Sequence, residues 1–133
     1  IFKSLRSNVV DILHQHKQSG HAVVIISATF SDLLEIVGQR LGVPHVIGTK
    51  LEVIDGKYTG KVVKPLCFSE NKAKLLKDFI DRNGLEAELS SSFAYADSIF
   101  DVPLLELVGN PVATYPDRNL RRLAKHNGWQ ILP

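Results

Sequence analysis

The sequence predicts an α/β fold built on a largely parallel sheet. Helical and strand-like segments alternate along all 133 residues, which is the order expected of a layered α/β structure. The continuous β-branched run AVVII at 22–26 is typical of a strand that is covered on both faces, as in parallel sheets. The length suits one domain, and the chain contains no repeat, low-complexity segment or linker.

The elements of the first part of the chain can be assigned in order. Apolar residues at helical spacing predict a helix over 3–19. The strand at 22–26 follows, and residues 27–32 (SATFSD) are expected to form a loop and the start of a second helix. The apolar stripe of that helix runs over 33–41, and Gly42 is expected to end it.

The remaining elements begin with a hairpin. Two strand-like runs flank Asp55-Gly56, which is the strongest short-range hairpin signal. Ser69 is expected to cap a helix that ends at Asn83-Gly84. The segments that complete the alternation are a strand at 91–96, a helix at 103–108, a strand at 111–115, a helix from the cap Asp117 to Ala124, and a strand at 129–132.

Composition excludes several classes of protein. The net charge of +2 is too small to indicate nucleic acid or a membrane surface as a partner. The longest apolar runs fall far short of the ~20 residues that span a bilayer. The lone Cys67 excludes an internal disulfide framework and suits a reducing compartment. We therefore expect a cytoplasmic protein.

Two carboxylates follow the predicted strand at 91–96. Asp97 stands at its end, and Asp101 stands near the start of the next helix. Ligands bind outside the carboxyl ends of strands in such sheets, so this loop is a candidate site. One interpretation makes Asp97 an Asx-turn residue and Asp101 a helix N-cap. The other makes the loop a Mg²⁺ site, because Mg²⁺ takes oxygen ligands from one or two carboxylates and from substrate phosphate.

The loop after the strand at 22–26 is the second candidate. Ser27 is either a cap of the following helix or part of a phosphate site, formed by its hydroxyl and by the backbone N–H groups of Ser27, Ala28 and Thr29. Lys72 lies in the first turn of its helix, where a cation opposes the helix dipole. It is either a solvated lysine or the partner of an anion, namely Asp97, Asp101 or a phosphate.

Other polar residues are expected to be structural. The histidines lack a matching acid or cysteine cluster and are interpreted as surface residues, Cys67 as a core residue, and the arginines as a solvated helix face. The histidines and arginines concerned are His14, His16, His21, Arg118, Arg121 and Arg122.

The segments IISAT, ENKAKLL and YADSIFDVPLLELVG, taken in this order, resemble the haloacid dehalogenase (HAD) superfamily. They are most similar to its phosphoserine-phosphatase-like branch, the subfamily IB hydrolases, and the similarity runs through the GTKLEVIDGKYTGKV hairpin to the C-terminal residues. The resemblance implies a HAD-like Rossmannoid three-layer sandwich with a β-hairpin insertion. It also implies Mg²⁺-dependent hydrolysis of a small phosphomonoester through an aspartyl-phosphate.

The resemblance also assigns roles to individual residues. Ser27 matches the second motif, whose hydroxyl binds the transferring phosphoryl group next to the backbone of Ala28. Lys72 matches the third motif and stabilises charge on the phosphoryl oxygens. Asp97 matches the Mg²⁺ ligand of the fourth motif, and Asp101 matches its second acid, which supports the metal site or the lysine. This set suits phosphoryl transfer, which depends on positioning and on neutralising spread negative charge.

The chain departs from the family pattern in two ways. Ala96 stands where the family usually has glycine. More importantly, no D-x-D-x-[TV] motif is present to supply the aspartate nucleophile, and no helical cap precedes the first helix. Residues 1–133 therefore resemble a partial core domain, incomplete at the N-terminus, that carries motifs two to four. Such a fragment is expected to be inactive by itself.

The missing strand would leave unpaired edges on the strands that end near Ser27 and Asp97. We expect upstream sequence, a complementing chain or a homo-oligomer to fill the gap. One alternative is a non-catalytic α/β module that keeps the fold for binding or interaction. A nucleotide-binding Rossmann-type domain is a further alternative, but no G-x-G-x-x-G follows any strand.

Overall fold

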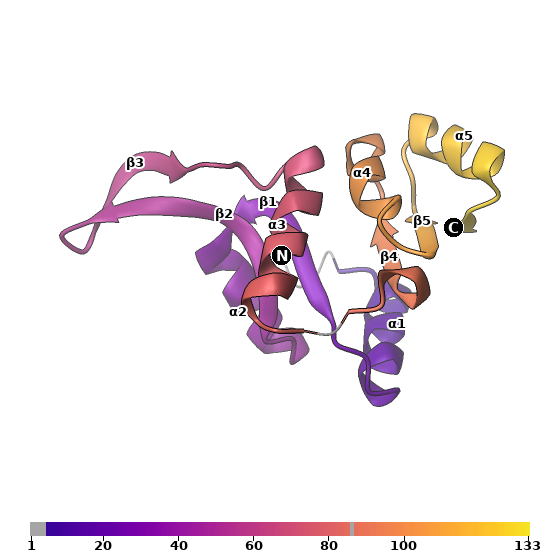
Figure 1. Ribbon diagram of the computed structural model, residues 1–133, viewed down its shortest axis with the longest axis horizontal. Helices are drawn as coiled ribbons and strands as arrows, with labels where there is room; N and C mark the ends of the chain where they lie inside the picture. Colours follow the sequence, from indigo (N-terminus) through magenta and orange to yellow (C-terminus); the bar gives the residue numbers. More distant parts are fainter. Residues whose placement is uncertain (1–4, 86) are drawn as a thin grey trace. The chain divides into compact units, whose positions relative to one another are not determined.

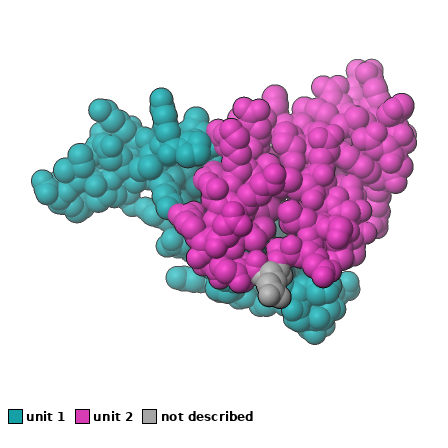
Figure 2. Space-filling model, viewed as in Figure 1, with its two compact units in different colours: residues 1–67 teal, residues 68–133 magenta. Residues whose placement is uncertain are grey.

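The computed structural model describes residues 5–85 and 87–133 of the chain. They fall into two compact units, which Figure 2 distinguishes by colour: unit 1 ends at Cys67, and unit 2 runs from Phe68 to Pro133. Each unit contains one three-stranded sheet. The α/β class expected from the alternating segments is confirmed.

Unit 1 has two parallel strands and a hairpin (Figure 1). Its elements are α1 (Ser7–Gln18), β1 (Val24–Phe30), α2 (Ser31–Leu41), β2 (His45–Ile54) and β3 (Lys57–Val63). Strands β1 and β2 pair in parallel, and β2 and β3 pair antiparallel. The helix expected over 3–19 is observed as α1, and its expected first residues lie outside the described residues. Gly42 ends α2 in a left-handed conformation, as expected.

The hairpin prediction is confirmed. Asp55 and Gly56 have φ angles of 50° and 75°, so both central residues of the turn are left-handed, as a type I′ turn requires. Val53 pairs with Tyr58 across the two strands. The Tyr58 hydroxyl donates a hydrogen bond to the Asp32 carboxylate, which attaches the hairpin to the first turn of α2.

The loop expected at 27–32 was wrong in its extent, because β1 continues to Phe30 and α2 begins directly afterwards. The cause lies in the neighbouring strand. The parallel register is irregular after Ile26, and it resumes where Phe30 pairs with Thr49. The extension needs a close approach at Gly48, where a Cβ atom would lie 2.8 Å from the carbonyl oxygen of Thr29. Periodicity within residues 27–32 could not show this tertiary contact.

Unit 2 carries a wholly parallel sheet in the order β4-β5-β6. Its elements are α3 (Glu70–Arg82), the 3₁₀ turn η2 (Leu89–Ser91), β4 (Phe93–Ala96), the 3₁₀ turn η3 (Ile99–Asp101), α4 (Val102–Leu105), β5 (Asn110–Thr114), α5 (Arg118–Asn127) and β6 (Gln130–Leu132). Its buried core consists of Leu105, Ala113, Leu120 and Ala124. In unit 1, Cys67 is fully buried, as expected.

Two terminal details of the unit 2 helices differ from expectation. Ser69 occupies the N-cap position of α3, as expected, but it has a φ of 50° and its side chain makes no capping hydrogen bond. The helix expected over 103–108 starts one residue earlier and ends at Leu105. Asp117 does cap α5, because its carboxylate accepts the N–H of Leu120.

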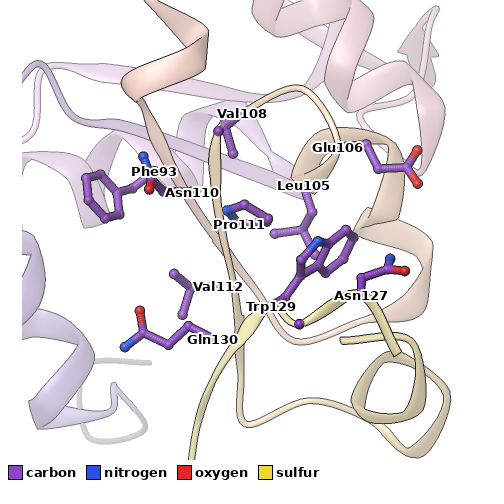
Figure 3. Close-up of a pocket in the computed structure, with 12 residues that line it drawn as sticks. Phe93, Leu105, Glu106, Val108, Asn110, Pro111, Val112, Asn127, Trp129 and Gln130 are labelled. Carbon is purple, nitrogen blue, oxygen red and sulfur yellow. The ribbon is translucent and has the colours of Figure 1, made fainter. Parts of the chain in front are cut away.

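A cavity of about 570 Å³ opens on unit 2 (Figure 3). Its lining includes Phe93, Asn110 and Gln130, the first residues of the three parallel strands, together with Trp129. It therefore lies at the amino ends of the strands. Asp97 follows the carboxyl end of β4, at the opposite edge of the sheet, so the cavity is not part of the predicted site.

The first strand of each sheet keeps an open edge. Among the described residues, β1 pairs only with β2, and β4 pairs only with β5. An open edge presents unpaired N–H and C=O groups that another strand can pair with. Within the same residues, every helix is too short or too polar to cross a lipid bilayer.

Candidate functional site

Lys72 and Asp101 form an ion pair in unit 2. The Nζ atom of Lys72, in the first turn of α3, donates to Oδ1 of Asp101 at 2.6 Å. The two side chains are only 12% and 11% exposed. Lys72 is therefore not a solvated lysine, and its anionic partner is Asp101.

The local sequence explains how Asp101 reaches this position. Ser98, between the two acids, accepts the N–H of Phe100 at 3.2 Å and so starts the turn η3. Asp101 ends η3, and Pro103 occupies the first turn of α4, where its missing N–H costs nothing. The carboxylate of Asp101 makes no capping hydrogen bond to α4. Asp101 therefore occupies the N-cap position of α4, as one interpretation expected, but its side chain pairs with Lys72 instead of capping the helix.

Asp97 has a different environment. It follows β4 directly and is exposed. Within residues 5–85 and 87–133, no hydrogen bond or ion pair involves its carboxylate, so the Asx-turn interpretation is not supported. The preceding Ala96 lies in β4 and has no positive φ, so alanine in place of the family glycine causes no backbone strain. The Asp97 carboxylate is thus open to solvent and to a cation.

A second loop contacts this one. The backbone N–H of Asp117 donates to the carbonyl oxygen of Asp97 at 2.8 Å. One carboxylate oxygen of Asp117 accepts the N–H of Leu120 at 2.8 Å, and the other accepts the N–H of Ile99 at 2.8 Å. These backbone hydrogen bonds, that from Leu120 foremost, lower the pKa of Asp117 below its ordinary value. The sequence indicated the cap but not the contacts with Asp97 and Ile99.

The residues present suit Mg²⁺ as one part of a larger ligand set. Within the described residues, no three His, Cys, Asp or Glu side chains converge as a metal site. Mg²⁺ keeps several waters and uses one or two carboxylates with substrate phosphate, so a single exposed carboxylate fits its needs. Asp97 can supply that carboxylate, whereas Asp101 is occupied by Lys72. Thr114, at the carboxyl end of β5, has a buried hydroxyl oxygen without a partner among the described residues.

The candidate phosphate loop belongs to unit 1. The hydroxyl oxygen of Ser27 accepts the N–H of Thr29 at 3.2 Å, whereas the N-cap position of α2 is taken by Phe30. Ser27 is therefore not the cap of α2. The hydroxyl of Thr49, on β2, donates to the carbonyl oxygen of Ala28 at 2.9 Å and accepts the N–H of Cys67 at 3.1 Å.

Thr49 is 3% exposed, so these two hydrogen bonds fix the backbone next to Ser27 from inside the unit. The sequence did not indicate Thr49, because its partners lie far away along the chain. The only available signal was that Thr49 lies in the strand-like run before the Asp55-Gly56 turn.

The predicted site residues are thus divided between the units. Lys72 and Asp101 are in contact, and Asp97 precedes Asp101 on the connection after β4. Ser27 and Ala28 belong to unit 1, and their convergence with the other three stays a prediction.

Five of the six remaining polar residues are exposed, as expected, and His16 is the exception. Arg118, Arg121 and Arg122 are exposed on α5. His14 and His21 are exposed, and His16 is half-buried. The Nδ1 atoms of His16 and His21 lie 2.9 Å apart. Partial burial, followed by the neighbouring His21, lowers the pKa of His16.

Comparison with known proteins gives the family. A family model described as haloacid dehalogenase-like hydrolase matches residues 2–106. The chain belongs to this family. The match includes the segments around Ser27, Lys72, Asp97 and Asp101, so the resemblance inferred from the motifs is confirmed.

Named relatives include phosphatases with different substrates. The chain is 38% identical over 121 residues to a phosphoserine phosphatase of Mycobacterium tuberculosis, covering 91% of this chain and 39% of that protein. It is 33% identical over 123 residues to a histidinol-phosphatase of Neisseria meningitidis, covering 91% of this chain and 55% of the relative.

A solved structure of a Bordetella pertussis protein described as having unknown function is also similar. It has a TM-score of 0.90 and 34% identity, and the match covers 98% of this chain and 59% of that chain. Together with the family match, this similarity confirms the HAD-like α/β fold expected from the sequence. The chain spans only about half of the length of these similar proteins.

Proposed function

We propose that this chain supplies the phosphate-binding, lysine and metal-binding motifs of a Mg²⁺-dependent phosphomonoester hydrolase. The observation that carries the proposal is the nearly buried Lys72–Asp101 ion pair, together with an exposed Asp97 whose carboxylate has no partner among the described residues. Membership of the haloacid dehalogenase-like hydrolase family supports it, as do relatives named as phosphatases.

Each residue has a role that its surroundings support. Asp101 holds the Lys72 ammonium at 2.6 Å and so positions a fixed positive charge for the phosphoryl oxygens. Ser27 offers a hydroxyl and Ala28 a backbone N–H to the phosphate. Asp97 would hold Mg²⁺. When bound, this ion supplies charge neutralisation on the phosphate and on the attacking group.

The nucleophile must come from outside these residues. The chain contains no D-x-D-x-[TV] sequence, so we expect no hydrolysis by this chain alone. Strands β1 and β4 each keep an open edge among the described residues. A further parallel strand that carries the nucleophile would pair with such edges. It could come from the same gene product, from a complementing chain or from a homo-oligomer.

The substrate class is a small phosphate monoester. Phosphoserine and histidinol phosphate are candidates by the names of relatives. Both are phosphate esters of amino alcohols, so an amine-bearing monoester is the first class to test. Family membership by itself does not fix this choice.

The test uses a gene product that joins this chain to an upstream D-x-D-x-T segment. Hydrolysis of p-nitrophenyl phosphate is measured with Mg²⁺, after EDTA, and after Mg²⁺ is restored. Activity should vanish with EDTA and return with the metal. Asp97→Asn should lower turnover by about a hundredfold or more, because transition-state charge loses its counter-ion. Asp78→Asn, which removes an exposed carboxylate from α3, is the matched control.

Two outcomes would reject the proposal. Unchanged turnover in the Asp97→Asn variant would remove the metal assignment. A complete gene product that hydrolyses no phosphomonoester would favour the non-catalytic binding module instead.

Size-exclusion chromatography with light scattering on this chain, with and without a peptide that carries the upstream strand, tests whether the open edges recruit a partner.

A further inference from the structure

We propose that Asp117 is a positioning residue for the metal-binding loop, and that it holds the backbone on both sides of Ser98 so that Asp97 is presented to the cation. The inference rests on the proposed function, because it concerns the same Mg²⁺ site. It assigns a role to a residue outside the family motifs discussed above.

Three hydrogen bonds carry the inference. The N–H of Asp117 donates to the carbonyl oxygen of Asp97, and the N–H of Ile99 donates to Oδ2 of Asp117, each at 2.8 Å. The third bond runs from the N–H of Leu120 to Oδ1 of Asp117, also at 2.8 Å. One aspartate therefore connects the loop after β4 to the first turn of α5.

The loop after β5 brings Asp117 to this place. Strands β4 and β5 are parallel neighbours, with Ala96 paired to Ala113, so their carboxyl ends meet at one edge of the sheet (Figure 1). Tyr115 has a φ of 47°, a left-handed conformation that is uncommon outside glycine. The backbone thus turns sharply just before Asp117 and the start of α5.

A helix cap alone would not need this arrangement. A capping side chain uses one oxygen, and serine, asparagine and aspartate serve about equally well. Here the second carboxylate oxygen accepts the N–H of Ile99, from a different connection. Serine has only one side-chain oxygen, and asparagine would place an NH₂ group at one of the two N–H donors. Aspartate is the short side chain that satisfies both donors.

The consequence falls on Asp97. Its carbonyl oxygen accepts the backbone N–H of Asp117, and two residues later the N–H of Ile99 donates to the Asp117 side chain. The Asp97 carboxylate itself is exposed. Residues that orient a metal ligand from behind typically change metal affinity about 10- to 100-fold when they are replaced. We expect Asp117 to act in this way on a ligand that its own side chain does not touch.

The experiment compares Asp117→Ser and Asp117→Asn with the wild type and with Asp81→Asn, all in the gene product that joins this chain to an upstream D-x-D-x-T segment. Both Asp117 variants keep one side-chain oxygen that can cap α5, but they lose the second oxygen, which accepts the N–H of Ile99. Asp81→Asn removes an exposed carboxylate from α3 and is the charge control. Backbone NMR follows the amides from Asp97 to Asp101 during titration with Mg²⁺ alone, and Mn²⁺ is used as a paramagnetic probe of the same site.

Hydrogen exchange supplies a readout that is independent of the metal. In the Asp117→Ser variant, the Ile99 amide should exchange at least tenfold faster, while the Leu120 amide stays within about threefold of wild type. The Mg²⁺ dissociation constant should rise about tenfold. The control should match wild type in both measurements. Asp117→Asn should repeat the loss of metal affinity if the serine variant does not fold.

The outcomes separate the two proposals. If wild type binds Mg²⁺ at Asp97 and both variants bind it equally well, the positioning role of Asp117 is wrong and the metal site stands. If the wild-type amides near Asp97 respond to neither metal, the Mg²⁺ assignment fails and the positioning role fails with it. Faster Ile99 exchange together with weaker Mg²⁺ binding supports both.

Discussion

The Lys72–Asp101 ion pair allows a quantitative prediction. Replacing Lys72 by methionine keeps much of the side-chain length and removes the charge. The Asp101 carboxylate then stays in a site where its side chain is only 11% exposed. Removing one partner of a buried ion pair costs about 3–5 kcal/mol, because the remaining charge is uncompensated. The Asp101→Leu variant should lose a similar amount, because it leaves the ammonium group unpaired.

The double variant makes the prediction specific. Exchanging both partners for apolar residues of similar volume is often neutral or stabilising. The combined Lys72→Met and Asp101→Leu variant should therefore be more stable than either single variant, by about 2 kcal/mol or more. A double-mutant cycle isolates this coupling from the separate effects of the two substitutions.

The measurement is native-state hydrogen exchange on the amides of α3 and α4, supported by urea unfolding. A loss of 3–5 kcal/mol raises the population of the opened state about a hundredfold to several thousandfold, because each 1.4 kcal/mol is a factor of ten. Lys77→Met, at an exposed position on the same helix, is the control and should change little. Single variants that lose less than about 1 kcal/mol, or a double variant that loses the sum of both, would contradict a tightly coupled buried pair.

Three further predictions concern the loops. Thr49→Val should lower the free energy of unfolding by about 2 kcal/mol, because the carbonyl of Ala28 loses its buried donor; Thr49→Ser keeps the hydroxyl and is the control in urea unfolding. Gly48→Ala should cost about 1–3 kcal/mol in the same assay, because its Cβ would lie 2.8 Å from the Thr29 carbonyl oxygen. Asp117→Ala should cost about 1 kcal/mol at neutral pH through the lost cap. The pKa of Asp117 is lowered in the folded state. The stability difference between wild type and Asp117→Ala should therefore be complete above the ordinary pKa of 3.8 and should disappear as the pH falls through the lowered value. Thermal unfolding from pH 7 to pH 2 can test this.

The fold could be predicted from the sequence where local signals and tertiary contacts agree. Asp55-Gly56 permits a turn with two positive φ angles, and the hairpin forms there. Gly42 ends α2 for a similar reason. At 27–32 the local signals favoured a loop and a helix start, but pairing with β2 extends β1 to Phe30. Pairing across the sheet overrode propensity, which a single-sequence pattern cannot reveal.

The candidate site was predictable to a similar degree. Asp97 and Lys72 could be identified because a charge at a strand end, or a cation in the first turn of a helix, needs an explanation. The partner of Lys72 stayed open, since it lies 29 residues further along the chain. Thr49 and the second role of Asp117 were missed for the same reason. Both act through hydrogen bonds to residues on other elements.

Asp97 and Asp101 are residues of the same type, but their different environments give them different roles. They are four residues apart and carry the same functional group. Asp101 is nearly buried, and its Oδ1 atom is paired with Lys72. Asp97 is exposed, and Asp117 fixes the backbone around it. One acid is therefore available to a metal and the other to a lysine. A Mg²⁺ site that takes one carboxylate from this chain must draw its other ligands from water, phosphate or further residues, which agrees with the lack of a three-ligand cluster among the described residues.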